Sequence, residues 1–164
     1  CLIAVFIYIL SDIWYNKMGD KMNIGIASDH RGYKLKQELT NFLKDIGYNI
    51  IDYGTTSTES TDYPIYAFKI GEAVRDKKID KGILICGTGI GMSIACNKVN
   101  GVRCAKVSSK EEASLCRLHN DANVIAIKEN EEDFKEIIIT FLTTEFSNEE
   151  KHIRRVNMIN EYNN

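Results

Sequence analysis

Five short apolar runs recur along this chain, and each is followed by a stretch in which apolar residues repeat at helical spacing. The runs predict β-strands at residues 23–27, 48–52, 82–85, 102–107 and 123–127. The other stretches predict helices at residues 32–45, 63–74, 92–99, 109–117, 131–145 and 148–160. Strands and helices that alternate in this way predict an α/β fold with a doubly wound, five-stranded parallel sheet, which is Rossmann-like and carries an extra C-terminal helix.

The first 21 residues do not share this pattern. A chain of 164 residues is long enough for one domain, and we expect that domain to span residues 22–164, with residues 1–21 as an N-terminal extension outside it. Residues 1–10 are apolar, but a membrane-spanning helix needs roughly 20 such residues, so no membrane association is expected. Two alternatives are the tail of a membrane segment and a real N-terminal helix. Met22 directly precedes the first strand and is the expected natural start.

Charge and cysteine content narrow the classes of function. The net charge is −2 and no basic block is present, which disfavours nucleic acid as a partner. Five cysteines without paired spacing predict no metal site and indicate reduced thiols in the cytoplasm. The residues after the first strand read SDHRG, which is not the dinucleotide fingerprint, so NAD is not expected.

The segment ICGTGIGMS at residues 85–93 carries the strongest chemical signal. Cys86 ends an apolar run and precedes Gly87, Gly89 and Gly91. A strand, a glycine-rich turn and a helix in succession direct backbone N–H groups into one concavity, which suits an anion or a developing oxyanion. A thiol at such a junction is a candidate base or nucleophile. The alternative is a buried structural cysteine before a turn.

Polar clusters follow three of the predicted strands, at residues 28–30, 55–62 and 86–91. Ligands of doubly wound sheets bind at the carboxyl ends of the strands, so these clusters are expected to converge there. Asp29 and His30 in the first cluster are suited to bind sugar hydroxyls or to move protons. The alternative is a helix-capping Asp beside an exposed His.

Two further groups lie elsewhere in the predicted topology. The sequence His119-Asn120-Asp121 falls between the fourth helix and the fifth strand, at the opposite edge of the sheet from Cys86. It is either a turn or part of a neighbouring subunit's site, and the residues alone favour the turn. A basic cluster in the last helix, from Lys151 to Arg155, is either a phosphate grip or a solvated face paired with Glu149 and Glu150.

Taken together, these motifs resemble the type B ribose-5-phosphate isomerases of the ribose/galactose isomerase family. The resemblance rests on GIASDHR at 25–31, IIDYGT at 50–55, STDYP at 60–64, the long stretch ICGTGIGMSIACNKVNGVR at 85–103, and HNDANV at 119–124. Each motif is weak alone, but their order and spacing are specific, and they cover nearly the whole predicted domain.

The resemblance implies interconversion of ribose 5-phosphate and ribulose 5-phosphate through an enediolate in the pentose phosphate pathway, without a metal or organic cofactor. It identifies Cys86 as the base that moves a proton between C1 and C2, and Thr88 as a proton relay at the oxygens. The backbone of the glycine loop, Gly87, Gly89, Ile90 and Gly91, is expected to stabilise the enediolate.

The same resemblance assigns the remaining site residues. Asp29 is expected to contact sugar hydroxyls, and His30 to lie near the phosphate. His119 resembles the acid–base that opens the furanose ring, with Asn120 on the sugar. Members are homodimers or homotetramers whose sites span two subunits, which would bring His119 to the chemistry. Arg155 and Lys151 match phosphate-binding positions of the last helix.

Two departures from the family pattern concern the phosphate. Asn130 stands where a phosphate-contacting Arg is expected, and Lys151 stands where the family has another Arg, so the bidentate fork is lost. Three glutamates, at 129, 131 and 132, would repel an anion if they faced the site. Arg154, His152 and Lys128 are the candidate replacements that the sequence offers.

Three other functions compete with the pentose isomerase. A galactose or allose 6-phosphate isomerase shares the chemistry, although subunits of the galactose enzyme generally lack the His119-Asn120 pair. A non-catalytic sugar-phosphate-binding homologue is disfavoured by the retained Cys86, Thr88, Asp29 and His119. A thiol redox protein is disfavoured because no resolving cysteine lies near Cys86 in the sequence.

Overall fold

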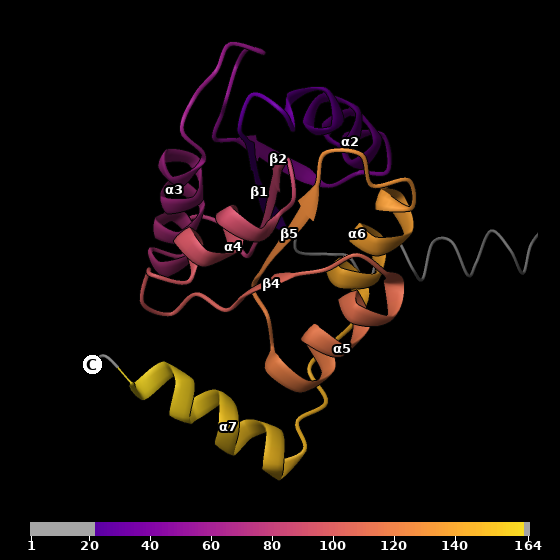
Figure 1. Ribbon diagram of the computed structural model, residues 1–164. Coiled ribbons are helices and arrows are strands. Elements are labelled where there is room, and N and C mark those ends of the chain that lie inside the picture. The colour runs from indigo at the N-terminus through magenta and orange to yellow at the C-terminus, as the bar shows by residue number, and fades with distance from the viewer. Residues whose placement is uncertain (1–21, 163–164) are drawn as a thin grey trace, which may run out of the picture.

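A computed structural model describes residues 22–162 of the chain (Figure 1). The predicted boundary after residue 21 therefore lies outside the described residues. Along the chain the elements are β1 (Asn23–Ser28), α2 (Tyr33–Asp45), β2 (Asn49–Asp52), α3 (Tyr63–Arg75), β3 (Lys81–Cys86), α4 (Ile90–Cys96), β4 (Cys104–Lys106), α5 (Lys110–Asn120), β5 (Val124–Lys128), α6 (Phe134–Thr143) and α7 (Glu150–Glu161). No helix in this part of the chain is both long and apolar enough to cross a membrane.

The five strands form one parallel sheet in the order β2-β1-β3-β5-β4. The predicted fold class is therefore confirmed. The chain moves from β1 outward to β2 through α2, and from β3 toward the other side of the sheet through α4. The direction of the connections thus reverses between β1 and β3, which are hydrogen-bonded neighbours, and this reversal creates a topological switch point.

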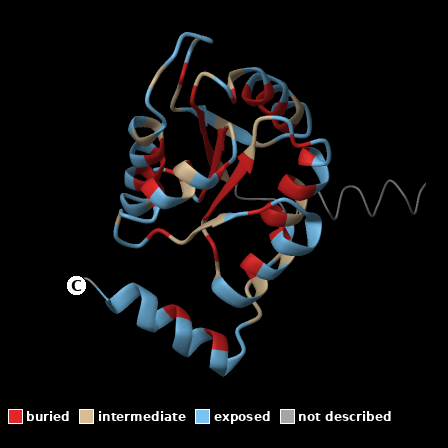
Figure 2. Ribbon diagram, viewed as in Figure 1, coloured by how far each residue is buried: buried red, intermediate tan, exposed pale blue. Residues whose placement is uncertain are grey.

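Helices cover both faces of the sheet, as Figure 1 shows. On one face, isoleucines of β1, β3 and β5 pack against α2, α5 and α6. On the other face, smaller side chains of the same strands pack against α3 and α4. The central strand β3 is buried along its whole length, which explains why it reads as a continuous apolar run (Figure 2).

Several predicted boundaries differ from the structure. Helix α4 begins at Ile90, two residues earlier than predicted, because Gly89 caps it in a left-handed conformation, and it ends at Cys96, three residues earlier than predicted. Strand β4 is only three residues long. Helix α5 continues past residue 117 to Asn120, where Asp121 adopts a left-handed conformation and ends it. Helix α6 is shorter at both ends, at Phe134–Thr143 instead of 131–145.

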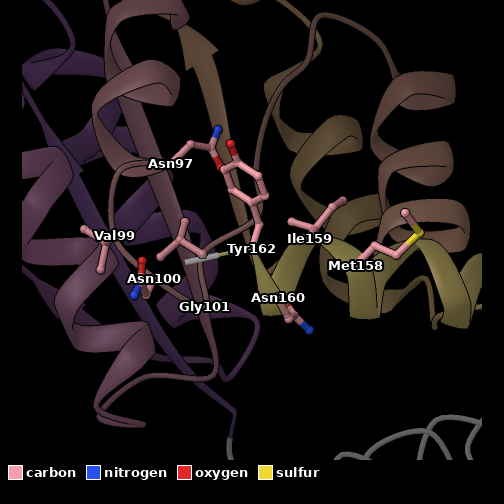
Figure 3. A pocket seen from close by; sticks show the side chains of 9 residues that line it. Asn97, Val99, Asn100, Gly101, Met158, Ile159, Asn160 and Tyr162 are labelled. Carbon is pink, nitrogen blue, oxygen red and sulfur yellow. The ribbon is translucent and has the colours of Figure 1, made fainter. Parts of the chain in front are cut away.

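Helix α7 lies outside the two helical layers and packs against α5 (Figure 1). Its buried side chains are His152 and Val156, whereas most of its surface is exposed (Figure 2). The exposed residues include large apolar ones, Ile153, Met158 and Ile159. A cleft separates the last turns of α7 from the turn at residues 97–102 (Figure 3).

Candidate active site

The candidate site lies at the switch point, where the loops after β1 and β3 leave toward opposite faces of the sheet. The two strands are paired to their ends, with Ser28 opposite Ile85, and the backbone N–H of Asp29 donates to the Ile85 carbonyl at 3.2 Å. This pairing places the polar residues that follow β1 directly beside Cys86, the last residue of β3.

Cys86 is buried, with 4% of its surface exposed, at the base of the glycine-rich loop. The backbone N–H of Gly89 donates to Cys86 Sγ at 3.1 Å. Gly89 has φ +77°, and a Cβ atom there would lie 3.1 Å from the Ile127 carbonyl carbon, so the turn needs glycine for both conformation and space. The loop thus presents an N–H donor to the thiol. Thr88 lies exposed next to it, and its Oγ1 accepts from the Ile90 N–H at 3.2 Å.

Asp29 is buried and stabilises the turn that precedes α2. Its Oδ1 accepts from the N–H groups of Arg31 at 3.0 Å and of Gly32 at 3.1 Å. The alternative of a helix-capping Asp beside an exposed His is not observed, because the N-cap residue of α2 is Gly32 and His30 is half-buried. Asp29 does lie at the predicted ligand edge of the sheet. His30 Nδ1 accepts from the Thr61 N–H at 3.2 Å, so Nε2 carries the proton of the neutral ring.

The loop after β2 meets the same edge. The Ser28 N–H donates to the Gly54 carbonyl at 2.7 Å, and the Thr55 N–H donates back to the Ser28 carbonyl at 2.8 Å. Together with the bond from Thr61 to His30, these contacts bring the three predicted polar clusters to one edge of the sheet. The ring of Tyr63 lies against Gly91, where an added Cβ would come within 2.7 Å of it. The STDYP segment thus packs on the glycine loop.

His119 and Asn120 lie at the opposite, amino-terminal edge of the sheet, in the last turn of α5. The His119 ring packs against His152 of α7, with centroids 4.5 Å apart. His152 Nδ1 lies 2.7 Å from Ser147 Oγ, and burial, followed by the nearby His119, lowers the pKa of His152 below its usual value. A single chain therefore does not bring His119 to Cys86, as its place in the sequence predicted.

The remaining predicted phosphate residues are on the exposed surface of α7. Lys151 and Arg155 are both exposed, and Lys151 Nζ pairs with Glu149 at 2.8 Å. Asn130, also exposed, follows β5 at the same edge as Cys86. No group of three or more His, Cys, Asp or Glu side chains suited to a metal ion occurs within residues 22–162.

One contact between charged residues at this edge was not predicted from the sequence. The Arg31 guanidinium pairs with the Glu129 carboxylate, which comes directly after β5. The same guanidinium lies over Gly87, where an added Cβ would be 3.1 Å from Arg31 Cζ. The paired residues are 98 positions apart, so no local pattern in the sequence indicates their contact.

Comparisons of the sequence with known proteins show which family and which proteins the chain resembles. The family model for Ribose/Galactose Isomerase matches residues 24–159. The chain is 48% identical to ribose-5-phosphate isomerase B of Escherichia coli over 103 residues, which cover 63% of this chain and 69% of that protein. It is 41% identical to the probable ribose-5-phosphate isomerase B of Mycoplasma genitalium over 147 residues, or 85% of this chain and 95% of that one.

Solved structures agree with these sequence matches. Ribose-5-phosphate isomerase B of Clostridium thermocellum superposes with a TM-score of 0.83 at 46% identity, covering 86% of this chain and 97% of that one. The Mycoplasma genitalium structure, which holds bound ribulose-5-phosphate, superposes with a TM-score of 0.81 at 38% identity, covering 86% and 95%.

Proposed function

The chain belongs to the ribose/galactose isomerase family, and on that premise we propose that it is an aldose–ketose isomerase that interconverts ribose 5-phosphate and ribulose 5-phosphate in the cytoplasm. The observation that carries this proposal is the position of Cys86. Its thiol lies at the switch point of the sheet, under the Gly89 N–H and beside Asp29 and His30. The reaction needs no redox partner, because a proton moves from C2 to C1 while the carbonyl moves from C1 to C2.

In this proposal Cys86 removes the C2 proton of the open-chain aldose and returns it to C1. The C2 proton is weakly acidic, so its removal requires a positioned base and a stabilised oxyanion. In this proposal the backbone N–H groups of the glycine loop, Gly87, Gly89, Ile90 and Gly91, stabilise the charge of the enediolate. Thr88, exposed beside the thiol, carries the proton between the two substrate oxygens.

In this proposal His119 opens the furanose ring of the substrate, and Asn120 contacts the sugar. Because His119 and Cys86 lie at opposite edges of one sheet, this step requires a second subunit to deliver His119. The exposed apolar residues of α7, next to His119, support a homodimer or homotetramer formed through this helix. Lys151 and Arg155 of the same helix would then arrive with His119 and bind the phosphate, together with His30.

A mixture of two inactive variants tests the shared site. Cys86→Ala and His119→Ala subunits are each expected to turn over the furanose substrate poorly, but their random co-assembly into dimers should restore about a quarter of the wild-type rate, since half of the dimers would hold one intact site. Mixed subunits that exchange, as seen by mass spectrometry, but regain no activity would refute the shared site.

Turnover by the full chain tests the function itself. We expect ribose 5-phosphate to be converted to ribulose 5-phosphate with incorporation of solvent deuterium in D2O, and allose and galactose 6-phosphates to react more slowly. Cys86→Ala should abolish turnover and deuterium exchange while the substrate still binds. The matched control is Cys104→Ala, at the amino end of the edge strand β4, which should remain active. Turnover of only a hexose phosphate would reassign the substrate, and normal turnover by Cys86→Ala would remove it as the base.

A further inference from the structure

We propose that Arg31 binds the substrate phosphate and that Glu129 competes with the phosphate for the same guanidinium. This inference rests on the proposed function, since it takes the ligand of the site to be a sugar phosphate. It assigns to this chain an anion grip at the edge where Asn130 stands in place of the arginine expected from the family resemblance.

The location of Arg31 carries the argument. Its guanidinium lies over Gly87, the residue directly after Cys86, at 3.1 Å from the Cβ position that Gly87 lacks. A larger residue at 87 would displace it. Arg31 also follows His30 in the chain, and the two side chains belong to the same turn that leads into α2. The guanidinium therefore borders the glycine loop and the proposed phosphate contact of His30.

The two ends of the candidate site differ in their exposure to solvent. Cys86, at the base, is 4% exposed, whereas 58% of the Arg31 side chain is exposed. The Gly89 N–H already donates to the thiol at the base of the site. An open-chain sugar phosphate with C1 and C2 at Cys86 extends outward and presents its C5 phosphate at the rim. A guanidinium at that rim matches a phosphate dianion in charge and in bidentate geometry.

The Glu129 carboxylate pairs with the Arg31 guanidinium. Their hydrogen bond and opposite charges raise the pKa of Arg31 further above its ordinary value, with smaller contributions from Asp29 and Cys86. Exposed ion pairs of this kind are weak, so a dianion displaces the carboxylate at little cost. The neighbouring Glu131 does not occupy this position, because it is buried, and its nearest cation is Lys128 Nζ at 3.8 Å.

Competition between Glu129 and phosphate for Arg31 predicts that neutralising the two partners of this ion pair changes the phosphate affinity in opposite directions. We would titrate the full-length protein with inorganic phosphate by calorimetry and measure KM for ribose 5-phosphate. Arg31→Gln should weaken phosphate binding about tenfold or more, because it removes a charge-assisted bidentate contact. Glu129→Gln should strengthen it about two- to fivefold, the range of an exposed ion pair. In Arg31→Gln protein, the second change Glu129→Gln should bring no gain.

Matched controls come from the pair of Arg75 and Asp76, at the far end of α3, with Nε and Oδ1 2.9 Å apart. Arg75→Gln and Asp76→Asn make the same changes in charge and should leave phosphate affinity unchanged. Equal weakening by Arg31→Gln and Glu129→Gln would show a purely structural ion pair and overturn the proposal. So would a fall in kcat at unchanged KM in Arg31→Gln, which would place the guanidinium at the enediolate instead. If the wild type lacks isomerase activity, the proposed function fails, but the phosphate titration still decides on Arg31.

Discussion

Two glycines share a left-handed backbone conformation, and replacing each of them by alanine measures how much the glycine loop contributes to stability and to activity. Gly89 has φ +77° and Gly101 has φ +81°, so an alanine at either position pays the cost of a left-handed residue, about 1–2 kcal/mol. At Gly101 an added Cβ meets nothing within 4 Å. At Gly89 it would lie 3.1 Å from the Ile127 carbonyl carbon, in the buried strand β5.

The two substitutions should therefore differ by the steric term alone. Gly101→Ala is expected to lower the free energy of unfolding by about 1–2 kcal/mol. Gly89→Ala should lower it by about 2–5 kcal/mol, because overpacking against backbone that cannot move away adds about 1–3 kcal/mol. Urea denaturation followed by circular dichroism measures both values, and equal losses would refute the inference that Gly89 is held against β5.

Activity separates the variants more sharply than stability does. The Gly89 N–H donates to Cys86 Sγ at 3.1 Å, and a shift of this turn would move the donor away from the thiol. If the loop stabilises charge during proton transfer, Gly89→Ala should lower kcat about 10²-fold, the cost of losing one such donor. Gly101→Ala should keep kcat near the wild-type value. A fully active Gly89→Ala protein would show that this N–H is not needed in the reaction.

Three further predictions concern buried charged and titratable side chains. Burial, and to a smaller extent Arg117, lowers the pKa of Lys81 from 10.5 to about 8. Between pH 8 and 10.5 the native protein therefore binds fewer protons than the unfolded chain, so the contribution of Lys81 to stability increases as the pH rises through this range. Lys81→Met should remove that slope in pH-dependent urea denaturation and raise the unfolding free energy at pH 7 by about 1–3 kcal/mol. Lys36 is fully buried and its Nζ lies 2.6 Å from Asp52 Oδ1, so Asp52→Asn should cost about 1.5–3 kcal/mol, most of it regained in the double variant with Lys36→Met. The lowered pKa of His152 stabilises the native state above pH 6.5, and this contribution is lost as the pH falls, so melting temperatures at pH 5 and 7 should differ less in His152→Gln than in the wild type.

The parts of the fold that the sequence predicted well depend on local patterns. Strand β3 is buried along its whole length, and its apolar run identified it directly. Helix α2 places Leu35, Leu39 and Leu43 on its buried face, in agreement with their helical spacing. The order of strands and helices then led to the sheet, because right-handed crossovers leave few arrangements.

The errors arose where conformation depends on contacts that no short window contains. Helix α5 runs three residues beyond its predicted end, because its terminus is set by Asp121, whose carboxylate binds both Arg103 and Arg117. That difference moved His119 from an expected turn into the last turn of a helix. Arg31 follows β1 and Glu129 follows β5. The two residues are 98 positions apart in the sequence, and only the assembled sheet brings their side chains into contact.

The topology also explains why the candidate catalytic residues lie at opposite edges of the sheet. A parallel strand brings every residue that follows it to one edge of the sheet, so the residues after β1, β2 and β3 converge at Cys86 without any further device. The same rule sends the residues that precede β5, including His119, to the other edge. Within one chain no loop movement of a few residues closes that gap, because the whole length of the buried strands lies between the edges. In the proposed oligomer formed through α7, catalysis that uses both Cys86 and His119 depends on the outer surface of this helix, and substitutions at its exposed apolar residues should impair ring opening without disturbing the site around the thiol.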